Sequence, residues 1–263
     1  MLPNAAPDVE RWLAALRERR SRREYDGRPV SEVDLSALEA TAAAFRPHED
    51  ARAVVIREAP ASLFFGIVGA YGRVSGAPSA LAFVAADGEA HYHCGYTGEG
   101  VVLEAAARGL DTCWVGGAFS RPCVAGLVDL APGDSVLAVS PVGHALERIP
   151  GREKLVFGAG KPKHRRALEE IAPGRQAWPA WARAGVEAAR IAPSAMNRQP
   201  WRFAFEDGAV RVWAAGTPAS KIMLRLDCGI AMLHFELAAR AEGCDGAWEP
   251  LEGRDVARWV PAS

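Results

Sequence analysis

The sequence has little of what a secreted or membrane protein needs. Its cysteines number five, an odd count, and no two of them form a CxxC pair, so a disulfide framework is not predicted. No apolar run approaches the roughly 18 residues of a membrane-spanning helix. The first dozen residues lack a basic start and an apolar core, so we expect no signal peptide. A cytoplasmic protein with no membrane partner is therefore expected.

Net charge is also scarce. The chain has 31 Lys and Arg residues against 32 Asp and Glu residues, which gives a formal net charge of −1. This balance argues against a broad nucleic-acid surface, which needs clustered and unbalanced cations. What the sequence does contain is core material, because 49% of its 263 residues are hydrophobic and 24% are charged. That composition suits one large or two small globular domains, and it still allows a local basic pocket for one phosphate.

Common catalytic and metal-binding patterns are missing as well. A P-loop-like stretch near residue 160 is broken by Leu155 and Pro162. No nucleophile-elbow pattern occurs. His91 and His93, followed by Cys94, could suggest a metal, but we interpret the alternating histidines as decoration on the edge of a strand. We therefore predict no metal site.

The most informative segment is the polar loop at residues 192–200. Pro193 ends the helix before it, because the proline ring clashes with a helical backbone. The loop then presents the polar side chains of Ser194, Asn197 and Gln199, and a half-buried strand follows it. A rigid loop with hydrogen-bonding groups beside an apolar wall suits a planar ligand with polar edges.

Four segments together resemble the FMN-dependent nitroreductase family. They are RRSRREY at 19–25, GLDTCWVGG at 109–117, the basic run KHRR at 163–166, and APSAMNRQPWRF at 192–203. Their order differs from the family, where the proline-containing loop lies between the first two segments. Here that loop follows both of them.

Internal similarity accounts for the unusual order. Two pairs of segments run parallel, residues 35–56 with 181–205 and residues 95–114 with 226–248. The first half keeps the RRSxR and GLDTCW segments, and the second half keeps the polar loop. The chain is thus similar to the duplicated TM1586-type nitroreductases, in which two halves stand for two subunits. We predict halves at 1–172 and 173–263; a chance echo between alanine-rich helices is the alternative.

The resemblance implies an α+β, nitroreductase-like fold. It is an internally duplicated single-chain pseudo-dimer with central, mainly antiparallel sheets flanked by helices. Local patterns agree with this class. Ser31 and Asp34 resemble a capping box, Asp207-Gly208 suits a hairpin turn, and Asp227 is expected to cap the last long helix.

The resemblance also implies FMN as cofactor and NAD(P)H as electron donor. In the family, two subunits build each flavin site jointly, so the fused chain is expected to keep one composite site. The cofactor-binding residues implied are Arg19, Arg20, Ser21, Arg23, Trp114, Val115, Gly116, Gly117, Lys163, Arg165, Arg166, Pro193, Ser194, Ala195, Asn197 and Gln199.

Each group of these residues has an implied role. Arg19 and Ser21 would reach the phosphate, since a phosphate prefers bidentate cations and a hydroxyl donor. Arg23 would approach the pyrimidine edge, and the basic run at 163–166 would complete the phosphate clamp. The backbone of 114–117 would lie near flavin N5, and the loop at 192–200 would cover the flavin edge, with Gln199 as a buttress. Solvated charges and a purely structural loop are the alternatives.

The implied activity is reduction of a small aromatic acceptor, a nitro compound or a quinone. NAD(P)H and the acceptor would exchange electrons in turn through flavin N5, with no catalytic side chain required. Gly116 stands where the family often has Glu, so a non-enzymatic or specialised flavin-binding protein is the main alternative. A scaffold without flavin is a third. We expect one flavin per chain and a monomeric pseudo-dimer.

Overall fold

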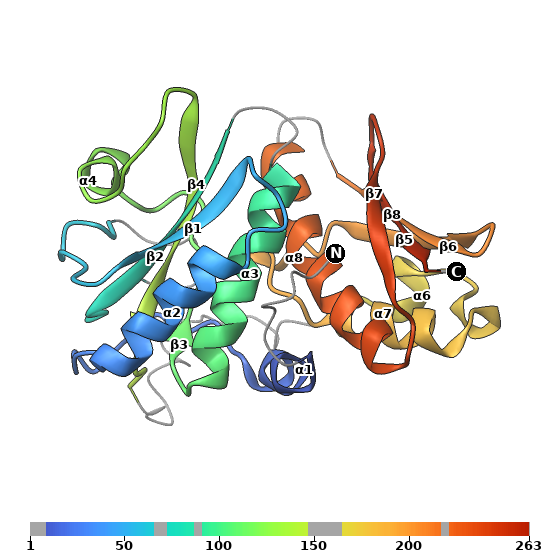
Figure 1. Ribbon diagram of the computed structural model, residues 1–263, viewed down its shortest axis with the longest axis horizontal. Coiled ribbons are helices and arrows are strands. Elements are labelled where there is room, and N and C mark those ends of the chain that lie inside the picture. The colour runs from blue at the N-terminus through green and yellow to red at the C-terminus, as the bar shows by residue number, and fades with distance from the viewer. Residues whose placement is uncertain (1–8, 66–72, 87–90, 147–164, 217–220, 263) are drawn as a thin grey trace, which may run out of the picture.

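The computed structural model describes residues 9–65, 73–86, 91–146, 165–216 and 221–262, which form two antiparallel sheets with helices around them (Figure 1). In the first sheet the strands are ordered β1 (Ala51–Ile56), β2 (Ser79–Ala86), β4 (Asp134–Gly143) and β3 (Asp111–Thr112). In the second they are ordered β5 (Trp201–Glu206), β6 (Ala209–Ala214), β8 (Asp255–Pro261) and β7 (Gly246–Pro250). All neighbouring strands are antiparallel, so the predicted α+β class is confirmed.

The two sheets share one order of elements. In each, a helix precedes the first strand, and a longer helix separates the second strand from the third. In the first half these helices are α2 (Glu32–Ala44) and α3 (His91–Ala107), and in the second half they are α7 (Ala180–Arg190) and α8 (Lys221–Ala241). The internal similarity of the sequence therefore has a counterpart in topology. The boundary near residue 173 stays a prediction.

Shorter elements complete the chain. They are α1 (Val9–Glu18), α4 (Arg121–Ala125), α6 (Leu168–Ile171) and the 3-10 turns η2 (Arg175–Ala177) and η3 (Ala195–Asn197). None of the helices in the described ranges is both long and apolar enough to cross a membrane.

Local sequence explains several of these boundaries. The Ser31 hydroxyl accepts a hydrogen bond from the backbone N–H of Asp34 at 3.1 Å, which begins α2 as the capping pattern predicted. Asp207 and Gly208 have φ angles of 52° and 78°. Two successive left-handed residues give the tight hairpin turn that joins β5 to β6.

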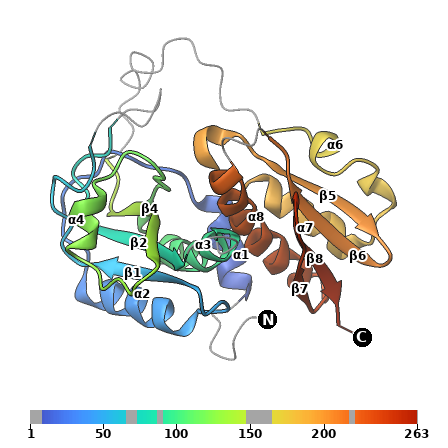
Figure 2. The ribbon, with the colours of Figure 1, turned by 90° about the horizontal axis from the view of Figure 1, so that it is seen from above.

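The long helices α3 and α8 cross between the two sheets (Figure 2). At the crossing, a Cβ atom added to Gly95 would lie 2.0 Å from the carbonyl oxygen of Leu226, and one added to Gly229 would lie 1.9 Å from that of Tyr92. The contact is reciprocal, since each helix supplies one glycine and one carbonyl. Only glycine allows two helix backbones to approach so closely.

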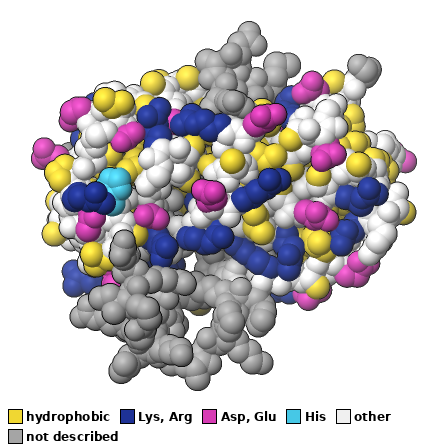
Figure 3. Space-filling view, turned by 90° about the horizontal axis from the view of Figure 1, so that it is seen from below, with side chains coloured by type: hydrophobic (Ala, Val, Ile, Leu, Met, Phe, Trp, Pro, Cys, Tyr) yellow, Lys and Arg dark blue, Asp and Glu magenta, His cyan; other side chains and the backbone are white. Residues whose placement is uncertain are grey.

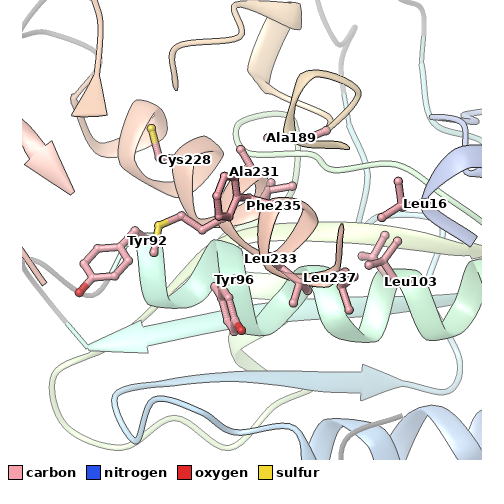
Figure 4. Close-up of a cluster of buried hydrophobic side chains, with 14 of the residues drawn as sticks. Leu16, Tyr92, Tyr96, Leu103, Ala189, Cys228, Ala231, Leu233, Phe235 and Leu237 are labelled. Atoms are coloured by element: carbon pink, nitrogen blue, oxygen red, sulfur yellow. The ribbon is translucent and has the colours of Figure 1, made fainter. Parts of the chain in front are cut away.

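The core lies at this junction between the halves (Figure 4). On α8 it includes Phe235 and Leu237, and from α3 it includes Tyr96 and Leu103, all of them buried. Leu16 of α1 joins the same cluster. Each half therefore completes its core with side chains from the other.

Three details differ from the sequence-based expectations. Helix α3 starts at His91, so His91 and His93 lie in its first turn and not on a strand edge. Asp227 lies inside α8, which starts at Lys221, so it is not a cap. The strands β7 and β8 were not predicted individually.

Candidate functional site

The RRSxR segment runs beside the GLDTCW segment. The backbone N–H of Arg22 donates to the carbonyl oxygen of Thr112 at 2.9 Å, and Ser21 pairs with Thr112 in a parallel bridge. The guanidinium of Arg22 lies 3.8 Å from the carboxylate of Asp111. Two of the predicted cofactor segments, far apart in sequence, are therefore neighbours in the fold.

Arg19 is a buried cation at this place. Its side chain is 8% exposed, and its Nε and Nη1 atoms have no hydrogen-bond partner among the residues described. Burial lowers the pKa of Arg19, and the charge of Glu99 opposes that effect. Buried guanidinium nitrogens without a hydrogen-bond partner are costly, so the place of Arg19 in the fold suits an anionic ligand.

Arg165 is a second cation whose electrostatics are coupled to Arg19. Its guanidinium donates to the carbonyl oxygens of Ile191 and Ala192, directly before the polar loop. The pKa of Arg165 is lowered to about 10, first by burial and then by the charges of Arg19, Arg190 and Arg20. The charges of three other arginines thus act on Arg165, which itself contacts the start of the loop. Figure 3 shows Lys and Arg side chains gathered in a band across one face of the molecule.

The loop at 192–200 has a specialised backbone. Met196, Asn197 and Gln199 have φ angles of 54°, 55° and 49°, a left-handed conformation that is uncommon outside glycine. The Ser194 hydroxyl accepts a hydrogen bond from the Gln199 N–H at 3.0 Å, and the Gln199 amide oxygen accepts one from the Arg166 N–H at 2.7 Å. Gln199 is 2% exposed, so its side chain ties the loop to the basic run.

Asp227 of α8 holds the same loop by a hydrogen bond. Its two carboxylate oxygens lie 3.0 Å and 3.1 Å from the backbone nitrogen of Ala195, which donates to them. Asp227 is 2% exposed, and burial raises its pKa to about 8, against the opposing effect of the Ala195 N–H. The residue thus connects the central helix α8 to the loop.

The 114–117 segment offers fewer free amides than the resemblance implied. The Val115 N–H donates to the Val139 carbonyl at 2.8 Å, so it is used within the sheet. Gly116 is half-buried and Gly117 is exposed, and these two remain for a ligand. The Trp114 side chain points inward, stacking on Phe83 with ring centroids 3.9 Å apart.

The other predicted residues are placed as follows. Arg20 is exposed, and its guanidinium donates to the carbonyls of Arg17 and Arg19. Ser21, Arg23 and Asn197 are half-buried, and Pro193 is buried. Lys163 lies outside the described residues.

Sequence reasoning missed three polar residues beside these segments: Glu99, His234 and Asp227. Glu99 and His234 are both 0% exposed, and they contact each other at 2.8 Å. The available signal was an ionisable residue inside an otherwise apolar helical run, which in a buried helix requires a partner. Their partners come from distant segments, so the sequence could not identify them.

Comparison with known structures defines the class of fold. A solved protein from Thermotoga maritima, described as "a putative nitroreductase", superposes with a TM-score of 0.64 at 21% identity, covering 95% of this chain and 93% of its own. A nitroreductase with bound FMN from Bacteroides fragilis matches with a TM-score of 0.43 at 21% identity, covering 57% and 97%. A nitroreductase family protein from Streptococcus pneumoniae matches with a TM-score of 0.44 at 16% identity, covering 61% and 98%.

The family follows from the sequence comparison. A family model described as "Putative TM nitroreductase" matches residues 12–239, most of the chain. The chain belongs to this family of nitroreductase-type enzymes, as its motifs predicted. No curated protein matches it.

Proposed function

We propose that the protein is an FMN-dependent oxidoreductase that uses NAD(P)H to reduce a small aromatic acceptor, a nitro compound or a quinone. One observation carries the proposal. Arg19 is buried with two guanidinium atoms unpaired among the described residues, and Arg165, Arg20 and Arg190 act on the same region. Such a set of cations needs an anion, and family membership makes the FMN phosphate the natural candidate.

The residues present fit an FMN phosphate. Arg19 and Arg165, which come from opposite ends of the first half, would hold the phosphate, with Ser21 as a hydroxyl donor. Ser21 is half-buried beside Thr112, within the same segment as Arg19. The bound FMN would supply the redox chemistry, accepting a hydride at N5 and passing electrons to the acceptor.

The chain's own contribution is placement. The amides of Gly116 and Gly117 would approach the flavin edge, because glycine leaves room for a ring beside the backbone. The loop at 192–200 would cover the other edge, held by Asp227 and Gln199. A loop fixed at both ends keeps its shape when the ligand enters, which lowers the entropic cost of binding.

A specialised flavin-binding protein of the same fold is the second candidate. The observation that favours it is Gly116, which occupies a position where the family resemblance leads one to expect Glu. Without that carboxylate, a nicotinamide or an acceptor has one fewer contact above the flavin. Steady-state NAD(P)H oxidation with quinone and nitro acceptors separates the two candidates, since holoprotein without turnover on any acceptor supports the binder.

The proposal has further parts. The two halves correspond to two fused subunits, divided near residue 173, with one composite FMN site per chain. The chain works as a monomeric pseudo-dimer in the cytoplasm, with a small-molecule acceptor as partner and no nucleic acid. The five cysteines are free thiols, which supports the location.

The decisive experiment measures the absorbance spectrum of the purified protein, its flavin-to-chain ratio and the FMN dissociation constant. Arg19→Ala should weaken FMN binding by about 1.5–3 kcal/mol, the usual range for a charge-assisted hydrogen bond. Arg28→Ala is the matched control, because Arg28 is exposed and pairs with Asp26 at 2.7 Å. A colourless protein that takes up no FMN would refute the proposal, and two flavins per chain would refute the single composite site.

A further inference from the structure

A buried row of hydrogen-bonded side chains crosses the junction between the halves. Glu99 of α3 is 0% exposed, and its two carboxylate oxygens have different partners. One accepts a hydrogen bond from the Trp114 indole N–H at 2.7 Å, and the other lies 2.8 Å from Nε2 of His234 on α8. The first half's 114–117 segment is thereby linked to the second half through one carboxylate.

This row of hydrogen bonds ends at α7. The Nδ1 atom of His234 lies 3.3 Å from the carbonyl oxygen of Ala188, so both ring nitrogens face acceptors. A neutral imidazole carries one ring N–H, so the tautomer of His234 decides whether it donates to Glu99 or to Ala188. A pair of this kind is costly to bury unless each hydrogen bond is made, so its geometry is tightly specified.

The position of Trp114 depends on this carboxylate. The indole packs between Phe83 and the α3 backbone at Gly98, where an added Cβ would lie 2.7 Å from Trp114 Cη2. Packing confines the plane of the ring, and the hydrogen bond to Glu99 fixes its orientation within that plane. The backbone of Trp114 leads through Val115 directly to Gly116 and Gly117.

Glu99 also lies near the phosphate side of the site. Its charge acts on Arg19, but its two oxygens are engaged by Trp114 and His234. Arg19 forms no ion pair with a carboxylate in the part of the chain that the structure describes. Glu99 is thus close enough to influence the cation and yet leaves it available to a ligand.

We propose that Glu99 is a positioning residue of the cofactor site: held by His234, it fixes the Trp114 indole so that the Gly116–Gly117 backbone keeps its place. The inference rests on the proposed FMN site. Glu99 acts through other residues and does not itself contact the flavin. Through Glu99, the 114–117 backbone of the first half depends on His234, a side chain of the second half.

Glu99→Leu removes both hydrogen bonds at similar volume and should raise the FMN dissociation constant by about tenfold or more. Amide hydrogen exchange at residues 115–117 of the apo protein should become faster. Glu99→Gln should stay within about threefold of wild type, because its amide oxygen can accept from Trp114 and its NH2 group can donate to His234.

The chain offers a matched control in Glu104. It lies on the same helix, is 2% exposed, and accepts a hydrogen bond from the Trp12 indole N–H at 3.0 Å. Glu104→Leu should lower the melting temperature but leave FMN affinity within about threefold and exchange at 115–117 unchanged. Equal loss of affinity in the two leucine variants would overturn the inference, as would wild-type affinity in Glu99→Leu.

One further variant keeps the test decisive. If Glu99→Leu fails to fold, Trp114→Phe removes the N–H donor together with part of the ring, and it should still weaken FMN binding and speed exchange at 116–117. No change in either quantity would overturn the inference. If the wild-type protein binds no FMN, the proposed function fails, and the exchange data alone then decide whether Glu99 positions the segment.

Discussion

Asp227 shows how one buried side chain can make the fold sensitive to pH. Its carboxylate holds the Ala195 N–H, yet it lies among apolar side chains of α8, and burial raises its pKa to about 8. The ordinary value is 3.8. The folded state therefore binds more protons at this position than the unfolded chain across that interval.

The contribution of the Asp227 carboxyl group to the free energy of unfolding should be fully present below about pH 4, and it should be lost as the pH rises through about 8. Asp227→Asn keeps an acceptor for Ala195 but cannot ionise. We expect the variant to be more stable than wild type above pH 8, by about 1–3 kcal/mol, and to show a flatter dependence on pH. Urea unfolding at pH 5, 7 and 9 measures this difference. A variant that loses stability equally at all three values would contradict the assignment.

At the residue scale, the sequence predicted those site residues that belong to short, recognisable motifs. Arg19 and Gln199 were recognised from short patterns, and the structure places both beside other predicted segments. Glu99 and Asp227 were not assigned to the site, because their roles come from partners in distant segments. The left-handed conformation of Met196 was equally inaccessible, since a tertiary hydrogen bond to the loop overrides the preference of a single residue.

At the element scale, the crossing of α3 and α8 depends on two glycines. An added Cβ at Gly95 would lie 2.0 Å from a carbonyl oxygen of the other helix, which is backbone and cannot rotate away. Gly95→Ala should therefore destabilise the protein by about 3 kcal/mol or more, despite the better helix propensity of alanine. Thermal unfolding measures the loss.

Gly126→Ala is the control for that prediction. Gly126 has an ordinary φ of −82°, and an added Cβ would meet only carbonyl oxygens at 3.6 Å and 3.7 Å. Its melting temperature should stay close to that of wild type. Similar losses in the two variants would mean that the crossing is not especially tight.

Elements with strong local signals were predicted well, and elements set by tertiary contacts were not. The cap at Ser31 and the turn at Asp207-Gly208 are encoded by neighbouring residues. The first turn of α3, at His91 and His93, was interpreted as the edge of a strand, because the glycines that follow lower helix propensity while serving the packing of α3. Strand β7 ends in Glu249 and Pro250 and is mostly exposed, so it lacks the alternation that marks a half-buried strand.

At the scale of the whole molecule, the shared core predicts cooperative unfolding. Phe235 and Tyr96 are buried at the same junction, although they belong to different halves. Neither half keeps its core covered without the other, so we expect a single unfolding transition in urea. Circular dichroism and amide exchange in β2 and β6 should report the same free energy. Two separate transitions would show that the halves are independent.

The reciprocal glycine contact has a consequence for how ligands enter. Both walls of the proposed site attach to α3 and α8, whose backbones meet too closely to slide or swing. We therefore expect a molecule without a central hinge. The distance between the two walls of the cofactor-binding site is then fixed when the protein folds. Exchange of cofactor and acceptor must then proceed by motion at the rim, and its speed should be insensitive to changes in the interior that leave the crossing intact.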